Sequence, residues 1–597
     1  MRPRRRFAGR ATTTSAAGAP GADYTDKRLP QFLRANRFIL LRISVFLLSC
    51  AGALAALASL GASASGDRPS ASAVAGTVAP VAPLLTGLDG YHFPLESRDR
   101  RVRRYFDQGM LLVFGFNPEE AARSFEAALA IDPSCVTCWR ALAWALGPNI
   151  NADMSPQAAL RVEQAVREAR RHAQRAGPVQ RSLIDALARR HPGNGVIDEE
   201  AYAQRMRALA SRYPRDAQTA LLAAEALMNL HPYDWWTTGG AAQPWTPEIQ
   251  GLLERALALQ PRHPGAHHYW IHLHESSPQP RRALPSADFL ASAVPGSGHL
   301  LHMPSHIYMR VGRFDDAIRA NLRSIEADQM YLAQVDAQDA YRVGYVAHNH
   351  HFLWAAAAMA GRQSLAQQAA LAAWPAACGP GQRDPGSAIV QQYAVLPYFT
   401  LVRFGEWQAL LHETPPPDSP RAYPLAIWHY ARGTARARTG QLDAAAQDLE
   451  RLEKLAAEPA LASFKVKNLN PTAQVARIAV LTLRAELALA RGEPQAAVAL
   501  LREATRIEDG FEYDEPHLWL APTRHALGAA LLAAGQPAQA EQVYRDDLRH
   551  YPDNGWSLSG LALAQAQQGQ TTLARRTESR ARAAFAGAER LPSGSRF

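Results

Sequence analysis

Cysteine is scarce in this chain: four residues in 597 exclude a scaffold built from disulfides. Strand patterns are nearly missing as well, because no sustained alternation of β-branched and polar residues occurs. With 47% hydrophobic and 20% charged residues, the composition is that of an ordinary folded protein. The length is about four times that of a typical domain, so one core is not expected. The sequence therefore predicts an all-α protein.

Several functional motifs are also absent. The chain has no nucleophile elbow, no phosphate-binding glycine-rich loop and no dinucleotide fingerprint. These absences argue against hydrolases of that type, kinases and nicotinamide enzymes, and predict no nucleotide cofactor. The net charge of +10 is concentrated in residues 1–42, which carry +8 and leave +2 for the remainder. Since a chain-wide basic surface is lacking, we expect no nucleic-acid partner.

Residues 1–64 are typical of a targeting segment. An uncharged apolar run occupies 43–66, directly after a basic stretch. Three interpretations fit this pattern: a signal peptide cleaved after Ala64, an uncleaved membrane anchor, or lipidation at Cys50. All three predict an exported protein of the periplasm or cell envelope, with membrane association through 43–66 if the segment is retained. Residues 65–97, rich in Ser, Ala, Pro and Gly, are expected to form a flexible leader.

From residue 98 onward the pattern predicts helical hairpins. Apolar residues recur at three- and four-residue spacing, and the best segments share a 34-residue period. A small residue, an aromatic and a closing proline take fixed places in it: Gly109, Phe125 and Pro133 in one unit, and Gly528, Tyr544 and Pro552 in another. The small residue lets two antiparallel helices approach, and the aromatic fills the gap. We expect one array over 98–378 and a second over 388–588, with irregular repeats in the middle.

Histidine placement is the most informative feature. Eleven of the 20 histidines lie within the 89 residues from His263 to His351. Residues three or four apart share one face of a helix, so each of three pairs is expected to present both rings together. The pairs are His268 with His272, His302 with His306, and His348 with His351, and Glu275 continues the first stripe. We predict that these seven residues are metal ligands that converge on one concave site.

The types of ligand restrict which metal ion we expect. Imidazole with one carboxylate suits Cu, Fe or Zn and disfavours Mg or Ca. Six histidines exceed a four-coordinate site, so either two ions bind or some rings orient ligands and carry protons. Pro304 argues against the pair of His302 with His306. A helix that begins at this proline leaves His302 outside it and weakens the geometry of the pair. The alternative is that buried histidines satisfy backbone carbonyls where the array bends.

Other polar residues are candidates for a pocket beside the pairs. They are Asn149, Asn151, Tyr269, His299, Tyr308, Arg310 and Glu515. The alternative for the two asparagines is that they cap a helix, and the alternative for the others is a structural role. Cys135 and Cys138 form a CxxC pair, and Trp139 excludes c-type haem attachment there. A local disulfide is favoured in an exported protein, and a redox-active pair is the alternative.

The sequence resembles a histidine-rich group of exported bacterial tetratricopeptide repeat proteins. The likeness spans roughly 100–565 and is carried by the phrases HYWIHLHE, GHLLHMPSHIYMRVGRF, HNHHF, DPSCVTCWRALAWALGPNIN and DEPHLWLAP. It implies a tetratricopeptide-like helical-hairpin solenoid, with the predicted metal ligands at signature positions of the group. It implies no particular reaction.

Two functions follow as expectations. The first is an exported repeat protein with a central transition-metal site that acts on a small molecule or peptide in its concave groove. Copper or iron there predicts an oxidoreductase, and zinc predicts hydrolysis by metal-bound water; the excess of histidine over carboxylate favours redox chemistry. The second is a non-enzymatic scaffold that binds a peptide or protein partner in the cell envelope.

Overall fold

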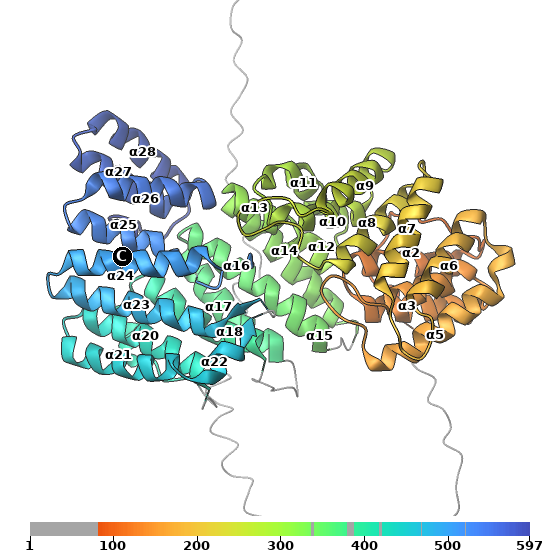
Figure 1. The fold of residues 1–597 in the computed structure, drawn as a ribbon, viewed down its shortest axis with the longest axis horizontal. Coiled ribbons are helices and arrows are strands. Elements are labelled where there is room, and N and C mark those ends of the chain that lie inside the picture. The colour runs from red at the N-terminus through yellow and green to blue at the C-terminus, as the bar shows by residue number, and fades with distance from the viewer. Residues whose placement is uncertain (1–81, 336–338, 379–386, 417–420, 467–468, 520) are drawn as a thin grey trace, which may run out of the picture. The chain divides into compact units, whose positions relative to one another are not determined.

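Helices that pair with their neighbours in sequence build this protein (Figure 1). The computed structural model describes residues 82–597, except 336–338, 379–386, 417–420, 467–468 and 520. The predicted targeting segment 1–64 therefore lies outside the described residues. The chain from Pro80 to Phe597 forms one compact unit. Within the described ranges, no helix is both long and apolar enough to cross a membrane.

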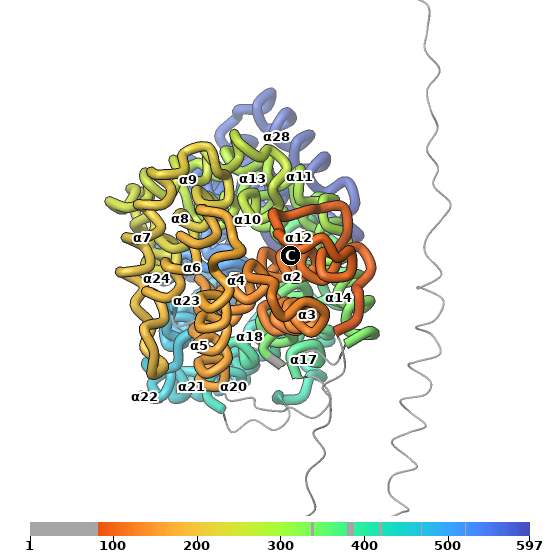
Figure 2. The backbone as a smooth tube through the Cα atoms, turned by 90° about the vertical axis from the view of Figure 1, so that its right-hand side faces the viewer, coloured from red at the N-terminus to blue at the C-terminus, as the bar shows by residue number. Residues whose placement is uncertain are grey.

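The first helices form short-turn hairpins, and α2 and α3 lie side by side (Figure 2). Polar side chains cap several N-termini, as where Asn117 Oδ1 accepts from the Glu120 amide. The helices of this part are α2 (Arg100–Phe114), α3 (Pro118–Ile131), α4 (Val136–Ala145), α5 (Pro156–Arg171), the 3₁₀ turn η1 (Ala173–Arg175), α6 (Pro178–Arg190), α7 (Glu199–Arg212), α8 (Ala217–Leu230) and α9 (Thr246–Leu259).

The central helices are shorter and less regular, as predicted. A loop follows α8 at His231, and two of the next helices have only five and eight residues. The elements are α10 (Pro264–Glu275), η2 (Pro280–Ala283), α11 (Leu284–Ala293), α12 (Gly298–His302), α13 (Pro304–Val311), α14 (Phe314–Leu332), α15 (Asp339–Tyr341), the π-helical turn η3 (Arg342–Val346), α16 (Ala347–Met359) and α17 (Gln363–Cys378).

The remaining chain returns to regular hairpins and contains a small antiparallel ribbon in which Val466 pairs with Asn470. Its elements are α18 (Ala388–Arg403), α19 (Trp407–His412), α20 (Ala422–Arg438), α21 (Leu442–Ala456), α22 (Pro459–Ser463), β1 (Lys465–Val466), β2 (Asn470–Pro471), α23 (Thr472–Ala490), α24 (Pro494–Asp509), α25 (Thr523–Ala533), α26 (Pro537–His550), α27 (Gly555–Gln567) and α28 (Thr571–Ala584). The chain is thus an all-α, tetratricopeptide-like helical-hairpin solenoid.

The predicted pairing of small and aromatic residues holds the hairpins together. A Cβ added to Gly109 on α2 comes 2.5 Å from Cε1 of Phe125 on α3. In the C-terminal repeats, a Cβ on Gly528 comes 2.3 Å from Cζ of Tyr544, and one on Gly560 comes 2.2 Å from the same atom. The aromatic ring therefore fills the space that each glycine leaves between neighbouring helices.

Gly109→Ala tests this close packing. The overpacking cost of about 1–3 kcal/mol exceeds the gain of about 0.5–1 kcal/mol from replacing a helical glycine, so we expect a lower free energy of unfolding. Gly251 is the matched control, because it is exposed on α9 and an added Cβ meets nothing within 4 Å. Gly251→Ala is expected to stabilise the protein. Urea unfolding followed by circular dichroism checks both, and stabilisation by both variants contradicts the packing argument.

A disulfide and a buried segment lie N-terminal to the central helices in the sequence. Cys135 and Cys138 form a disulfide at the start of α4, where Cys135 is the N-cap. Residues 82–97 belong to the segment expected to be a flexible leader; there Leu88 and Phe93 are buried in the main hydrophobic core. The predicted boundary at 379–387 lies almost entirely outside the described residues.

Candidate metal centre

Two groups of three histidines lie next to each other inside the protein. The first triad is His268, His272 and His299, and the second triad is His302, His306 and His348. In each triad, one ring nitrogen per histidine lies within 4.8 Å of the others, and all six residues are buried. The triads adjoin through His299 and His302, whose ring centroids are 5.8 Å apart.

The first triad comes from α10 and α12. His268 and His272 are one helical turn apart on α10, with ring centroids separated by 4.7 Å. His299 on α12 places its Nε2 3.1 Å from Nε2 of His268. The pair predicted from i,i+4 spacing, His268 with His272, is thus joined by His299 from the next histidine-rich stretch of the sequence.

Pro304 lies between His302 and His306 of the second triad but does not separate their rings. Pro304 begins α13, as anticipated, and His302 is the last residue of α12. Met303 between them keeps helical dihedrals (φ −51°, ψ −36°), so both rings remain on one face. Their Nε2 atoms are 2.9 Å apart, and the His348 ring from α16 lies 5.0 Å from the His302 ring.

Hydrogen bonds at Nδ1 orient three of the six rings, and an ion-pair contact at Nδ1 holds a fourth. His268 Nδ1 lies 2.6 Å from the Phe114 carbonyl, and His302 Nδ1 lies 2.7 Å from Asn321 Oδ1. His272 Nδ1 contacts Glu275 Oε1 at 3.0 Å, and His306 Nδ1 contacts Glu275 Oε2 at 2.7 Å. Oxygen atoms of these kinds accept, so each Nδ1 carries the hydrogen and donates. The Nε2 atoms are left to face the cluster, which is how metal-binding histidines are usually held.

Glu275 connects the two triads, because its two oxygens contact one ring from each. Glu515 adds a second carboxylate 2.7 Å from His306 Nδ1. Burial alone lowers the pKa of His306, but the two carboxylates raise it to about 9. Burial alone raises the pKa of Glu275, but His306 and His272 hold it well below its usual range. At neutral pH the His306 ring therefore carries a proton on both nitrogens, and a metal ion at its Nε2 would have to displace the proton there.

The residues present fit a transition-metal cation. Burial lowers the pKa values of His268, His299 and His302 well below the usual range, so these imidazoles are neutral, the form that binds a metal. Among the described residues, the buried Nε2 of His272 has no hydrogen-bond partner. A buried polar atom without a partner costs about 1–3 kcal/mol, and a cation in the first triad removes that cost.

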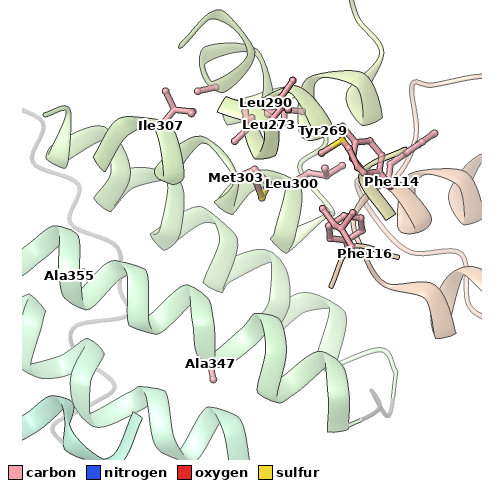
Figure 3. Close-up of a cluster of buried hydrophobic side chains, with 14 of the residues drawn as sticks. Phe114, Phe116, Tyr269, Leu273, Leu290, Leu300, Met303, Ile307, Ala347 and Ala355 are labelled. Atoms are coloured by element: carbon pink, nitrogen blue, oxygen red, sulfur yellow. The ribbon is translucent and has the colours of Figure 1, made fainter. Parts of the chain in front are cut away.

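One phenylalanine covers each triad. The Phe116 ring lies 4.5 Å from the His268 ring and 5.4 Å from the His299 ring. Its backbone has φ 51°, a left-handed conformation that is strained for a bulky residue and that places the ring against the triad. Figure 3 shows Phe116 beside Tyr269 of α10. The Phe352 ring on α16 covers the second triad in the same way, 4.5–4.9 Å from its three imidazoles.

A polar cover closes the first triad toward solvent. The Tyr233 ring lies 6.0 Å from the His272 ring, and the Tyr345 ring lies 4.8 Å from the His299 ring. Asn151 joins the two tyrosines: it accepts from the Tyr233 hydroxyl and donates to the Tyr345 hydroxyl at 3.1 Å. Tyr233 and Asn151 are exposed. The irregular loops after α4 and α8, together with the π-helical turn η3, therefore supply this cover.

The other predicted residues divide into neighbours of the triads and residues that face elsewhere. The Tyr269 ring lies 5.7 Å from the His268 ring, and Arg310 donates to the Glu275 carbonyl. Asn149 accepts from the Asn151 amide and supports the polar cover. The structure does not bring His351 into either triad, because its ring packs against Trp354 and Tyr393. Tyr308 also faces away and donates to Asp288.

Sequence reasoning missed several contributors. His299 was expected to line a pocket, although its i,i+3 spacing from His302 already placed it near the second pair. Phe116, Phe352, Tyr233 and Tyr345 carry no local signal, since an aromatic beside a metal site and one in a core look alike in sequence.

Asp328 on α14 positions ligands of both triads. It accepts from the Tyr341 hydroxyl at 2.8 Å and from Asn349 Nδ2 at 2.7 Å, next to His348. A Cβ on Gly298, the first residue of α12, comes 2.0 Å from Asp328 Oδ1. The carboxyl thus lies against the start of α12, which bears His299 and His302. Burial raises its pKa from 3.8 to about 7.

The Asp328 carboxyl predicts a pH dependence of stability. Between pH 3.8 and about 7, the unfolded carboxyl has lost its proton and the folded one keeps it. Its contribution to stability is therefore complete below this window and falls as pH rises, by up to about 1.4 kcal/mol per pH unit. Asp328→Asn is expected to flatten this slope, because the amide does not titrate. Urea unfolding at pH 5 and pH 7 checks it, and an unchanged slope contradicts the assignment.

Comparisons with known proteins find only distant structural likenesses. No protein-family model and no curated protein matches the chain. The human IFIT1 dimer with m7Gppp-AAAA is 12% identical, with 81% of this chain and 90% of that chain covered and a TM-score of 0.29. The P58(IPK) TPR domain is 12% identical, with 79% and 99% covered and a TM-score of 0.21. At these scores the likeness says nothing about the site.

Proposed function

We propose that this chain is an exported, bacterial-type tetratricopeptide repeat protein that holds two transition-metal ions, one in each histidine triad, and uses them for redox chemistry. The observation that carries the proposal is the gathering of six buried imidazoles into two adjacent groups, in which the Nδ1 atoms of His268, His272 and His302 are hydrogen-bonded away from the group. The apolar run at 43–66 supports export.

The ligand set favours copper. Neutral imidazoles bind Cu, Zn, Fe and Ni, and among divalent ions Cu²⁺ binds such sites most tightly. Both carboxylates in reach contact His306 Nδ1, so they balance charge around the triad. A copper or iron pair supplies one-electron steps and binding of small molecules. The protein orients the rings, excludes water with Phe116 and Phe352, and keeps His306 Nδ1 protonated through Glu275.

Metal analysis of the purified full chain tests the proposal. We expect about two copper ions per chain after loading and dialysis, one for each group of three imidazoles. His274→Ala is the matched control, because His274 is buried on α10 but its ring packs against Trp270, outside both triads. This variant should keep both ions. A folded wild-type chain that retains no metal overturns the proposal and favours the partner-binding scaffold. A chain that retains only zinc overturns the redox function and favours hydrolysis by metal-bound water.

A further inference from the structure

A small cavity lies directly behind the second triad. Its lining includes Met309, Phe352, Ala355, Met359, Glu515 and His517. Helix α16 carries Ala355 (Figure 3) and, one turn earlier along the chain, the Phe352 that covers the triad. The cavity volume is about 30 Å³, and a single buried water needs about 10–15 Å³ by the same measure. The space suits a molecule of two or three heavy atoms.

Two residues belong to both the cavity and the triad. Phe352 lines the cavity, and its ring is 4.5 Å from the His306 ring and 4.7 Å from the His302 ring. Glu515 also lines the cavity and reaches His306 Nδ1 at 2.7 Å. The Phe352 ring therefore borders both the cavity and the imidazoles of His302 and His306.

Two of the residues that line the cavity, Arg310 and Glu515, are ionisable, and both have partners outside it. Met309, Phe352, Ala355 and Met359 are apolar. The Arg310 guanidinium donates to the Glu275 and Ser277 carbonyls, and the Glu515 carboxylate contacts His306. Burial lowers the pKa of His517 to about 3, so this ring is neutral. A small uncharged molecule fits these surroundings, whereas an ion would lose its hydration without compensation.

The cavity beside the first triad differs. Phe116 and Tyr269 line it together with Asn149 and Glu225, and its volume is about 10 Å³, room for at most about one water. The cavity beside the first triad is thus the smaller of the two, although each triad is covered by one phenylalanine.

We infer that the cavity behind Phe352 admits a small uncharged molecule of the size of dioxygen or carbon monoxide to the second triad, and that Phe352 moves to let it pass. This inference names the substrate class of the proposed metal centre and rests on that proposal. Substrates larger than about three heavy atoms are excluded from this route, because the cavity is too small to hold them.

Xenon binding tests the cavity without any metal. Xenon is an uncharged probe that occupies apolar cavities, so crystals of the full chain under xenon pressure should show it beside Ala355. Ala355→Leu fills the cavity and should abolish this occupancy, and Ala355→Val should reduce it if the leucine variant folds poorly. A wild-type cavity without xenon overturns the inference even if both metal ions bind.

Carbon monoxide tests the connection to the triad. On copper(I)-loaded protein, infrared spectroscopy should show a bound C–O band. Ala355→Leu should slow its appearance by at least about tenfold, the factor for about 1.4 kcal/mol of added barrier. Ala145→Leu is the matched control, because Ala145 is a buried helical alanine that lines the other cavity. Equal rates in wild type and Ala355→Leu overturn the inference, and a chain that binds xenon but no metal overturns the proposed function instead.

Discussion

Alanine at His272 is expected to remove one metal ion and leave the other in place. His272 belongs to the first triad alone, and its Nε2 is a buried ligand atom without another partner among the described residues. Loss of one of three protein ligands leaves too few to hold an ion tightly. Metal content should fall from about two ions to about one per chain, because the second triad keeps all its imidazoles.

The reciprocal variant completes the test. His348→Ala should remove the ion of the second triad and spare the first, and the double variant should bind neither. His351→Ala is the matched control from the same helix, because His351 lies outside both triads. Metal content measured by mass spectrometry and unfolding followed by circular dichroism separate ligand loss from misfolding. If either single variant loses both ions while folded, the two sites are not independent.

Glu275→Gln is expected to weaken both sites together. The carboxylate accepts from His272 Nδ1 and forms an ion pair with His306 Nδ1, and an amide has only one oxygen to offer, so its NH₂ group meets the other Nδ1 hydrogen. Removal of such a supporting partner typically costs about 10–100-fold in metal affinity. Breaking a buried charge pair costs about 3–5 kcal/mol, so the metal-free protein should also unfold more easily.

Glu508→Gln provides the control for Glu275→Gln. Glu508 is a glutamate of α24 that accepts from the Thr523 amide and hydroxyl, outside both triads. Its substitution should change stability without changing metal affinity. Competition with a copper chelator measures the affinity of each variant. Equal affinity in wild type and Glu275→Gln contradicts the bridging role of this carboxylate.

Local patterns predicted most of the fold. The sequence pattern predicts helices near 180–190, 198–212 and 246–259, and these correspond to α6, α7 and α9, because periodic apolar residues and flanking prolines are strong local signals. The same pattern predicts a pair of helices over roughly 298–327, where the structure has three, α12, α13 and α14, interrupted at Met303 and Gly312. Gly312 has φ 81°, which ends α13 in a left-handed turn.

Spacing predicted which histidines share a helix face but not which faces meet. His268 with His272 and His302 with His306 follow directly from i,i+4 positions. His348 and His351 also share a stripe, yet only His348 points into a triad, because the π-helical turn before α16 and the packing of that helix set its rotation. Glu515 reaches His306 across more than 200 residues of sequence, and no local pattern records such a contact.

The order of these residues along the chain has a consequence for assembly. All six imidazoles come from an 81-residue stretch, His268 to His348, whereas Glu515 arrives only with the last hairpins. Contacts between nearby segments close at low entropic cost and form first, and N-terminal parts of a long chain fold before the rest has been made. If the proposed ions bind, the imidazole cage can take them up while one side is still open, before the C-terminal repeats dock and bring Glu515 to it.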